Sequence, residues 1–214
     1  MGHQHKAVTL QAVNKALEAH GYLLEVREAV GPETRVALEE PLAQRFHEGR
    51  VLDETLAVVA RLHGRKAVTQ VMYAASENTL RGVVAPLAKV LMSFAGGGPT
   101  PLLARFDALI AAGARGFVSR WEAVSATHGR LMISTVDVLP PEADYAWKGT
   151  VQYLLAFCEV EGVVTINSRQ NGGRELCLDV TWSPQPNSSA RDGKPATAPS
   201  RVTTADPTTQ PKRA

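Results

Sequence analysis

The sequence predicts an α+β fold: a helical N-terminal half packed on a C-terminal ββαββ unit whose four strands form one antiparallel sheet. Two observations predict this class. Apolar residues recur every three or four positions over much of residues 9–113, as they do on one face of a helix. Residues 114–182 contain two strand–turn–strand patterns on either side of one amphipathic segment, and this order of elements is typical of α+β domains.

We therefore expect a single domain over residues 9–182, made of a helical half (9–113) and a ββαββ half (114–182). Residues 1–8 are expected to be a flexible N-terminus. Residues 183–214 contain six of the 13 prolines and one large aliphatic side chain, so they bury too little apolar surface to offset the entropy cost of ordering. A disordered, weakly basic tail rich in Pro, Thr and Ser is expected there.

In the helical half, residues 10–20 are predicted to form the first helix, with Thr9 as its N-cap and Gly21 as its stop signal. Residues 22–40 fit two interpretations. One is a hairpin around the Gly-Pro pair, and the other is two short helices with Pro32 in the first turn of the second. The abundance of Glu, Ala, Arg and Leu favours the helices, and the hairpin stays open as the alternative.

Residues 51–63 and 66–75 follow as two further helices because their apolar residues keep a helical spacing. The apolar segment 79–94 is also predicted to be helical, with a kink or break at Pro86. After a glycine-rich run, residues 102–113 form another amphipathic helix.

The ββαββ half begins with a hairpin over residues 118–138 that turns around His128 and the glycine after it. Residues 148–162 are predicted to form one helix that ends at its last glycine. Residues 163–182 form the second hairpin. Its turn contains Asn171 followed by glycine, a strong hairpin signal because both residues accept a positive φ.

The run SFAGGGPTPLL, residues 93–103, raises the question of a phosphate-binding loop. A P-loop follows a strand and leads into its helix through Gly-Lys-Ser/Thr, whereas here a helix precedes and no lysine follows. The dinucleotide-binding pattern G-x-G-x-x-G is absent as well. We interpret the run as a joint in which the glycines end one helix, Thr100 caps the next and Pro101 occupies its first turn. An anion on that helix N-terminus is the alternative.

The six histidines form no metal-binding pattern, because no pair has HxxxH or HExxH spacing and neither cysteine lies near one. His3 and His5 are expected to chelate a metal only adventitiously, like a short tag. His20 and His63 each precede a helix-ending glycine, where a cation favours the helix dipole, and His128 lies in a turn. No metal site is predicted.

No catalytic constellation is found either: the nucleophile elbow G-x-S-x-G is absent and the carboxylates are spread over helix ends and exposed faces. Trp121, Trp147 and Trp182 are expected to pack in the core or at its rim. Cys158 lies on the core-facing stripe of its helix, whereas Cys177 shares a strand face with Asp179, so two reduced thiols are expected.

Bulk properties point to a cytoplasmic protein. No stretch reaches the roughly 18 apolar residues of a membrane span, and the N-terminus has no signal-peptide core. The formal charge of +2 is uneven, since residues 183–214 carry +3 and leave −1 on the remainder. A body without positive charge lacks the field of a nucleic-acid-binding protein.

Four segments carry a family resemblance: LMSFAGGGPTPLLARF, GARGFVSRWEAVSATHGRLMISTVDVLPP, WKGTVQYLLAFCEVEGVVTINSRQ and the closing CLDVTW. Over roughly residues 67–182 the chain resembles a set of myxobacterial paralogues, a domain-of-unknown-function family that implies no known reaction. More loosely, the layout is similar to haem–nitric-oxide-binding and vinyl-reductase-like sensing domains. A haem sensor needs an axial histidine facing a pocket, and no motif selects His20, His47 or His63, so no cofactor is predicted and haem is not expected.

Three functions follow as hypotheses. The first is a non-enzymatic sensing or regulatory module that binds a small apolar ligand between the helices and the sheet, or a protein partner. The second is a homo-oligomeric scaffold, for instance a homodimer, that recruits partners through its surface or its tail. The third, an enzyme of unrecognised class, stays open because active sites assemble from residues distant in sequence. Neither a membrane nor a nucleic acid is expected as a partner of the folded body.

Overall fold

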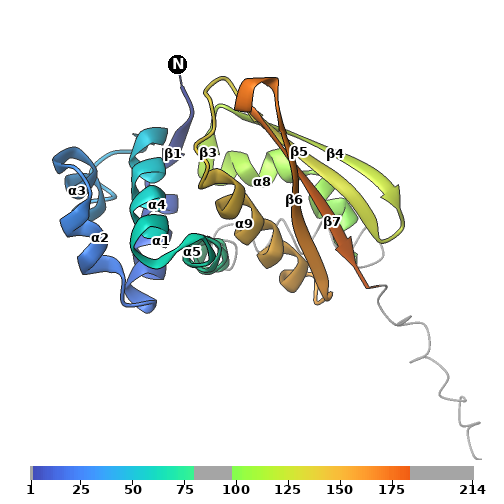
Figure 1. The fold of residues 1–214 in the computed structure, drawn as a ribbon, viewed down its shortest axis with the longest axis horizontal. Coiled ribbons are helices and arrows are strands. Elements are labelled where there is room, and N and C mark those ends of the chain that lie inside the picture. Colours follow the sequence, from blue (N-terminus) through green and yellow to red (C-terminus); the bar gives the residue numbers. More distant parts are fainter. Residues whose placement is uncertain (1, 80–97, 184–214) are drawn as a thin grey trace, which may run out of the picture. The chain divides into compact units, whose positions relative to one another are not determined.

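The computed structural model describes residues 2–79 and 98–183 (Figure 1). The contacts divide the chain into two units, Met1–Pro184 and Gln185–Ala214, and every described residue belongs to the first. The kinked helix predicted for residues 79–94 lies outside the described residues except for Thr79. The predicted tail lies outside them except for Ser183.

The N-terminal half is helical, as predicted. Its helices are α1 (Ala7–Ala19), α2 (Leu23–Ala29), α3 (Pro32–Glu39), α4 (Gly49–His63) and α5 (Arg65–Thr79). Residues 22–40 therefore adopt the helical interpretation, with Pro32 in the first turn of α3. The predicted stops at Gly21 and Gly64 are confirmed by their positive φ values of 75° and 84°.

The predicted N-cap of α1 is wrong. The helix begins at Ala7, two residues before Thr9, and Lys6 precedes it without a side-chain cap. The Thr9 hydroxyl instead donates a hydrogen bond to the Gly113 carbonyl oxygen at 2.8 Å. The reason is that a strand runs directly into the helix, so the chain has no free turn in which Thr9 could act as a cap.

That strand belongs to a three-stranded antiparallel sheet, which the sequence did not predict. The strands are β1 (Gln4–Lys6), β2 (Phe46–Glu48) and β3 (Ala114–Arg115), in the order β2-β1-β3. Strands of two or three residues are too short to show a period. His3 and His5 are only 7% and 8% exposed beside and within the central strand, so the expectation of a tag-like pair is wrong.

The second stretch of helix differs from the single helix predicted for residues 102–113. It consists of α7 (Thr100–Ala104) and α8 (Phe106–Gly113), which are separated at Arg105. Pro101 lies in the first turn of α7, as predicted. Thr100 is the first helical residue and makes no side-chain cap, because the chain enters the helix at Pro99.

The C-terminal half confirms the predicted four-stranded antiparallel sheet, whose strand order is β4-β5-β7-β6. Its elements are β4 (Phe117–Ser125), β5 (His128–Thr135), α9 (Ala143–Phe157), β6 (Gly162–Gln170) and β7 (Glu175–Trp182). Asn171 and Gly172 have the predicted positive φ values, 52° and 67°. Some boundaries differ. His128 begins β5 instead of lying in the turn, and α9 covers Ala143–Phe157 instead of residues 148–162, so that Gly162 begins β6 instead of ending the helix.

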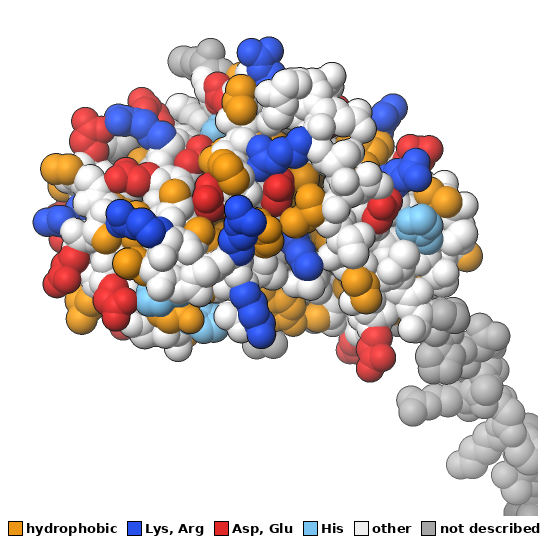
Figure 2. All heavy atoms as spheres, viewed as in Figure 1, with side chains coloured by type: hydrophobic (Ala, Val, Ile, Leu, Met, Phe, Trp, Pro, Cys, Tyr) orange, Lys and Arg blue, Asp and Glu red, His pale blue; other side chains and the backbone are white. Residues whose placement is uncertain are grey.

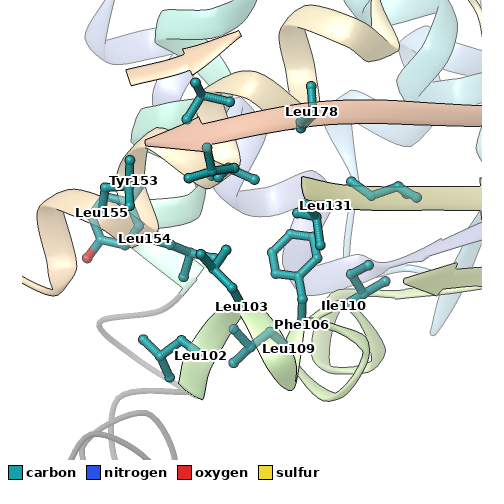
Figure 3. Close-up of a cluster of buried hydrophobic side chains, with 14 of the residues drawn as sticks. Leu102, Leu103, Phe106, Leu109, Ile110, Leu131, Tyr153, Leu154, Leu155 and Leu178 are labelled. Carbon is teal, nitrogen blue, oxygen red and sulfur yellow. The ribbon is translucent and has the colours of Figure 1, made fainter. Parts of the chain in front are cut away.

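Two apolar clusters form the core. One lies on the inner face of the four-stranded sheet, where Leu131 and Leu178 meet side chains from α7, α8 and α9 (Figure 3). The other lies among α1 to α5. The three tryptophans pack in or against the first cluster, as predicted. Cys158 is buried in it, Cys177 lies on the opposite sheet face, and no disulfide joins the two, as predicted.

The helical half meets the ββαββ half where α5 crosses α9. At Gly149 the two backbones approach so closely that a Cβ would lie 2.3 Å from the Thr69 carbonyl oxygen and 3.0 Å from the Tyr73 nitrogen. Beside this crossing, the Ser76 hydroxyl lies 3.1 Å from that of Thr150. Glycine therefore fixes the distance between two helices that also form walls of the cavity described below. Of the described helices, none has both the length and the apolar character to span a membrane.

Candidate functional site: an apolar cavity beside a histidine-bearing strand

A cavity of about 130 Å³ lies between the helical half and the ββαββ half. Together with the open solvent at its mouth, the empty space around it amounts to about 950 Å³. Its described walls come from the N-terminal segment, α1, α4, α5, α8 and α9, and from the segments that flank β4 and α9. They are mostly apolar and include Leu56, Met72, Phe106, Ile110, Trp147 and Leu154. Such a cavity is suited to an apolar ligand.

His3 lies at the cavity with both ring nitrogens committed. Its Nδ1 lies 2.9 Å from Asp137 Oδ2, and its Nε2 lies 3.3 Å from Asp53 Oδ2. Hydrogen bonding to Asp53 raises the pKa of His3 above 6.5, with Asp137 adding to the effect and burial opposing it. His3 thus joins α4 to the segment between β5 and α9, and both carboxylates favour its protonated form.

His5 has the opposite environment. It is buried, lines the cavity, and its Nδ1 has no hydrogen-bond partner among the described residues. Burial, together with the charges of His3 and His47, lowers the pKa of His5 from 6.5 to about 3. The imidazole is therefore neutral at pH 7 and offers a lone pair. A buried polar atom without a partner is rare in proteins and calls for an explanation.

The histidines considered from the sequence lie elsewhere. His20 stacks on Tyr22, and His63 stacks on the same ring with its Nε2 3.4 Å from Glu25. His47 lies opposite His5 in the small sheet, and its Nε2 lies 2.7 Å from the Pro41 carbonyl oxygen. None of these three lines the cavity.

Sequence reasoning missed the pair at the cavity, although a signal was present. His3 and His5 occupy alternate positions, so on an extended segment both side chains point to the same face. The segment was not identified as a strand because its partners, β2 and β3, lie about 40 and 110 residues away in the sequence. Without a predicted strand, the two-residue spacing of His3 and His5 could not be interpreted as two side chains on one face.

The remaining charges show no second centre. On the face in Figure 2, Lys and Arg side chains lie among Asp and Glu side chains rather than forming a broad area of one sign. Within residues 2–79 and 98–183, no group of three or more His, Cys, Asp or Glu side chains is arranged to hold a metal ion. The cavity is the feature of the described chain that best fits a ligand.

Comparison with known proteins gives no match to a family model and none to a curated protein. Solved structures do match. An Fe(II) unliganded H-NOX protein from K. algicida superposes with a TM-score of 0.62 at 8% identity, over 84% of this chain and 97% of that one. An oxygen-binding H-NOX domain related to soluble guanylate cyclases gives a TM-score of 0.57 at 13% identity, over 84% and 95%. A further match, at a TM-score of 0.58 and 15% identity, concerns heme redox potential and porphyrin distortion.

This chain therefore has the fold of H-NOX domains, which agrees with the looser likeness to haem–nitric-oxide-binding domains and leaves the myxobacterial resemblance without support. The prediction that no cofactor is bound and that haem is not expected is corrected by this finding. One of the matched structures is an Fe(II) H-NOX protein, and another concerns the heme redox potential and the distortion of the porphyrin. The prediction weighed His20, His47 and His63, none of which lines the cavity, and left out His3 and His5, which do.

Proposed function

We propose that this chain is a non-enzymatic sensing module that holds a haem-class tetrapyrrole at the mouth of the cavity between its two halves, where His5 would bind the iron. The observation that carries the proposal is the buried, neutral imidazole of His5, which lines an apolar cavity and keeps Nδ1 without a partner among the described residues. The shared fold with H-NOX structures supports it.

The choice of His5 follows from the donors at the cavity. Haem iron takes histidine, cysteine, methionine or tyrosine as its axial ligand. Among the described lining residues these types are represented by His3, His5 and Met72. His3 has both ring nitrogens engaged by carboxylates, and a thioether is a weaker donor than a neutral imidazole. His5 is therefore the best available ligand.

The dimensions decide how such a group would lie. A cavity of about 130 Å³ is close to one of about 150 Å³ that admits benzene, so it is too small for a whole tetrapyrrole. Most of a bound tetrapyrrole would therefore lie at the mouth, within the empty space of about 950 Å³ that also includes open solvent. No Lys or Arg lies among the described lining residues, so the charged groups of such a ligand would need hydration by water at the mouth.

The chain's own residues would then act as follows. Bound iron supplies a coordination position for a small gaseous ligand. His5 donates its lone pair without first losing a proton, because its pKa is low. The apolar walls exclude water. His3, two residues before His5, contacts Asp53 of α4 and Asp137 of the segment before α9. A movement of His5 along the chain would therefore also move these two contacts.

The test is a titration of the purified full chain with haemin, followed by the Soret band and by thermal melting. We expect stoichiometric binding with the spectrum of a histidine-ligated haem, and a changed spectrum with about tenfold weaker binding in His5→Ala. His20→Ala, which removes a histidine that stacks on Tyr22 away from the cavity, should behave like the parent chain. An unaltered spectrum in His5→Ala would exclude the axial role, and a parent chain that binds no haemin would exclude the group.

A second candidate keeps the sensing role but changes the ligand, and the cavity volume of about 130 Å³ favours it. A space of this size fits a small apolar molecule such as benzene or indole. Saturating indole should then raise the melting temperature of the parent chain, and filling the cavity with Ala146→Phe should abolish that rise. No shift with indole, together with stoichiometric haemin binding, would decide in favour of the first candidate.

A further inference from the structure

We propose that two copies of this chain associate through the free edge of β4, which pairs antiparallel with its own copy around Trp121. The two four-stranded sheets would then form one continuous eight-stranded sheet. This inference is independent of the proposed cavity ligand, because β4 lies at the edge of the large sheet and its paired strand is β5.

The outer edge of β4 is long, and no other described strand pairs with it. The strand has nine residues, Phe117–Ser125, and lies at one side of the four-stranded sheet (Figure 1). Its positions are exposed or half-buried throughout. Val118 is 66% exposed and Val124 is 50% exposed. An edge strand presents a row of backbone N–H and C=O groups that can pair with another strand, and apolar side chains on such an edge favour association.

The sequence of β4 is self-complementary, which selects a second copy as the occupant. In an antiparallel pair centred on Trp121, Arg120 of one copy lies opposite Glu122 of the other, and the symmetry makes this contact twice. The two tryptophan positions face each other across the axis. Opposite charges and apolar pairs at directly opposed positions stabilise antiparallel strands.

The two charged side chains of β4, Arg120 and Glu122, are available to pair with a second copy. Arg120 and Glu122 are both exposed, and neither forms an ion pair with a described residue. The register irregularity of β4 lies between Ala123 and Ser125, so residues 119–123 on both sides of the axis keep regular pairing geometry. The central five residues can thus form a ladder without rearrangement.

The opposite edge of the sheet, β6, lacks these properties. Its register irregularity lies between Ile166 and Ser168, at the middle of the strand. The side chain of Asn167 is engaged by Asp179, and Arg169 is held by Asp144. Pairing of β6 with its copy would bring no opposite charges together. The comparison favours β4 and supplies a control edge within the same sheet.

Charged residues on an edge strand can also keep sheets apart, and the two roles differ in their response to charge reversal. We would measure the mass of the full chain by analytical ultracentrifugation over a hundredfold range of concentration. Association through β4 predicts a reversible monomer–dimer equilibrium. Arg120→Glu and Glu122→Arg each place like charges opposite one another twice and should weaken the dimer about tenfold or more. The double variant R120E/E122R restores opposite charges and should recover the parent affinity.

Val163→Lys on the β6 edge serves as the control and should leave the equilibrium unchanged, since Val163 is 58% exposed at the other side of the sheet. Thermal melts of each variant check that it folds. A parent chain that stays monomeric at every concentration overturns the proposal. So does a dimer that ignores both single reversals, or a double variant that remains as weak as the singles although it melts like the parent.

Discussion

Two groups of His3 meet one oxygen of Asp137. The His3 backbone nitrogen lies 2.8 Å from Asp137 Oδ2, and the ring Nδ1 lies 2.9 Å from the same atom. His3 precedes β1, whereas Asp137 follows β5, so 134 residues of chain separate the partners. The pair fastens the N-terminal segment to the ββαββ half. Because His5 is two residues further along the same segment, this fastening also fixes the imidazole that lines the cavity.

The variant Asp137→Asn tests the fastening. An amide keeps the size of the side chain but removes the charge that favours protonated His3, so we expect the free energy of unfolding to fall by about 1 kcal/mol. The loss is small because the Asp137 side chain is 41% exposed, so solvent screens its interaction with His3. In a domain of this size, about 1 kcal/mol lowers the melting temperature by about 2–4 °C. Glu18→Gln, an exposed carboxylate of α1, is the matched control and should change the melting temperature by less than that.

The same pair predicts a dependence on alkaline pH. The pKa of His3 is raised above 6.5, so its stabilising contribution is complete below pH 6.5 and is lost as the pH rises through the folded-state value. The pKa of Asp137 is lowered from 3.8 by its hydrogen bonds to His3, so its contribution is lost only in acid. The stability difference between the parent chain and Asp137→Asn should therefore shrink from pH 6 to pH 9. Urea unfolding at each pH measures it, and a difference that grows over this range would contradict the assignment.

His5 predicts a loss of stability at acidic pH. Its pKa is lowered to about 3, so the unfolded chain takes up a proton below pH 6.5 that the folded chain refuses. Stability without added haem should fall by about 2 kcal/mol between pH 7 and pH 5 from this group alone. The variant His5→Leu removes the titrating ring and should lose correspondingly less over the same interval. Equal acid losses in the two chains would show that His5 is protonated in the folded state.

Much of the fold could be predicted because its signals are local. The Asn171-Gly172 turn and the stop at Gly21 each depend on a backbone conformation that glycine or asparagine tolerates, and both occur where the sequence predicts them. The break at Arg105 could not be predicted, because Leu102, Phe106 and Leu109 keep a helical spacing across it. Apolar periodicity reports which side chains share a face and does not report a change of backbone conformation at one residue.

The site was harder to predict because its parts are distant in the sequence. His3 gains its meaning from Asp53 and Asp137, about 50 and 134 residues away, and none of the three belongs to a motif. The cavity itself is a property of packing between α5, α8 and α9. The sequence alone shows two histidines near an N-terminus, and only pairing of β1 with β2 and β3 buries them.

The crossing of α5 and α9 gives a prediction about packing. Alanine is the better helix former by about 1 kcal/mol, so Gly149→Ala would stabilise an isolated helix. In this chain the added methyl group would lie 2.3 Å from the Thr69 carbonyl oxygen, and backbone cannot move aside as a flexible side chain would. We expect a net loss of about 2 kcal/mol or more in urea unfolding. Gly98→Ala is the control and should be neutral, because no described heavy atom lies within 4 Å of the point that its methyl carbon would occupy.

The last prediction concerns Arg169, which fastens β6 to the start of α9. Its guanidinium contacts Asp144 at 2.9 and 3.0 Å and also donates to the carbonyl oxygens of Leu139 and Pro140. Lysine keeps the charge but cannot reach three acceptors in one plane, so Arg169→Lys should lower the free energy of unfolding by about 1–2 kcal/mol. Arg174→Lys, at an exposed position in the β6–β7 turn, should have no measurable effect. Chemical denaturation of both variants at pH 7 separates the geometry of the guanidinium from its charge, and equal midpoints would show that the charge alone suffices.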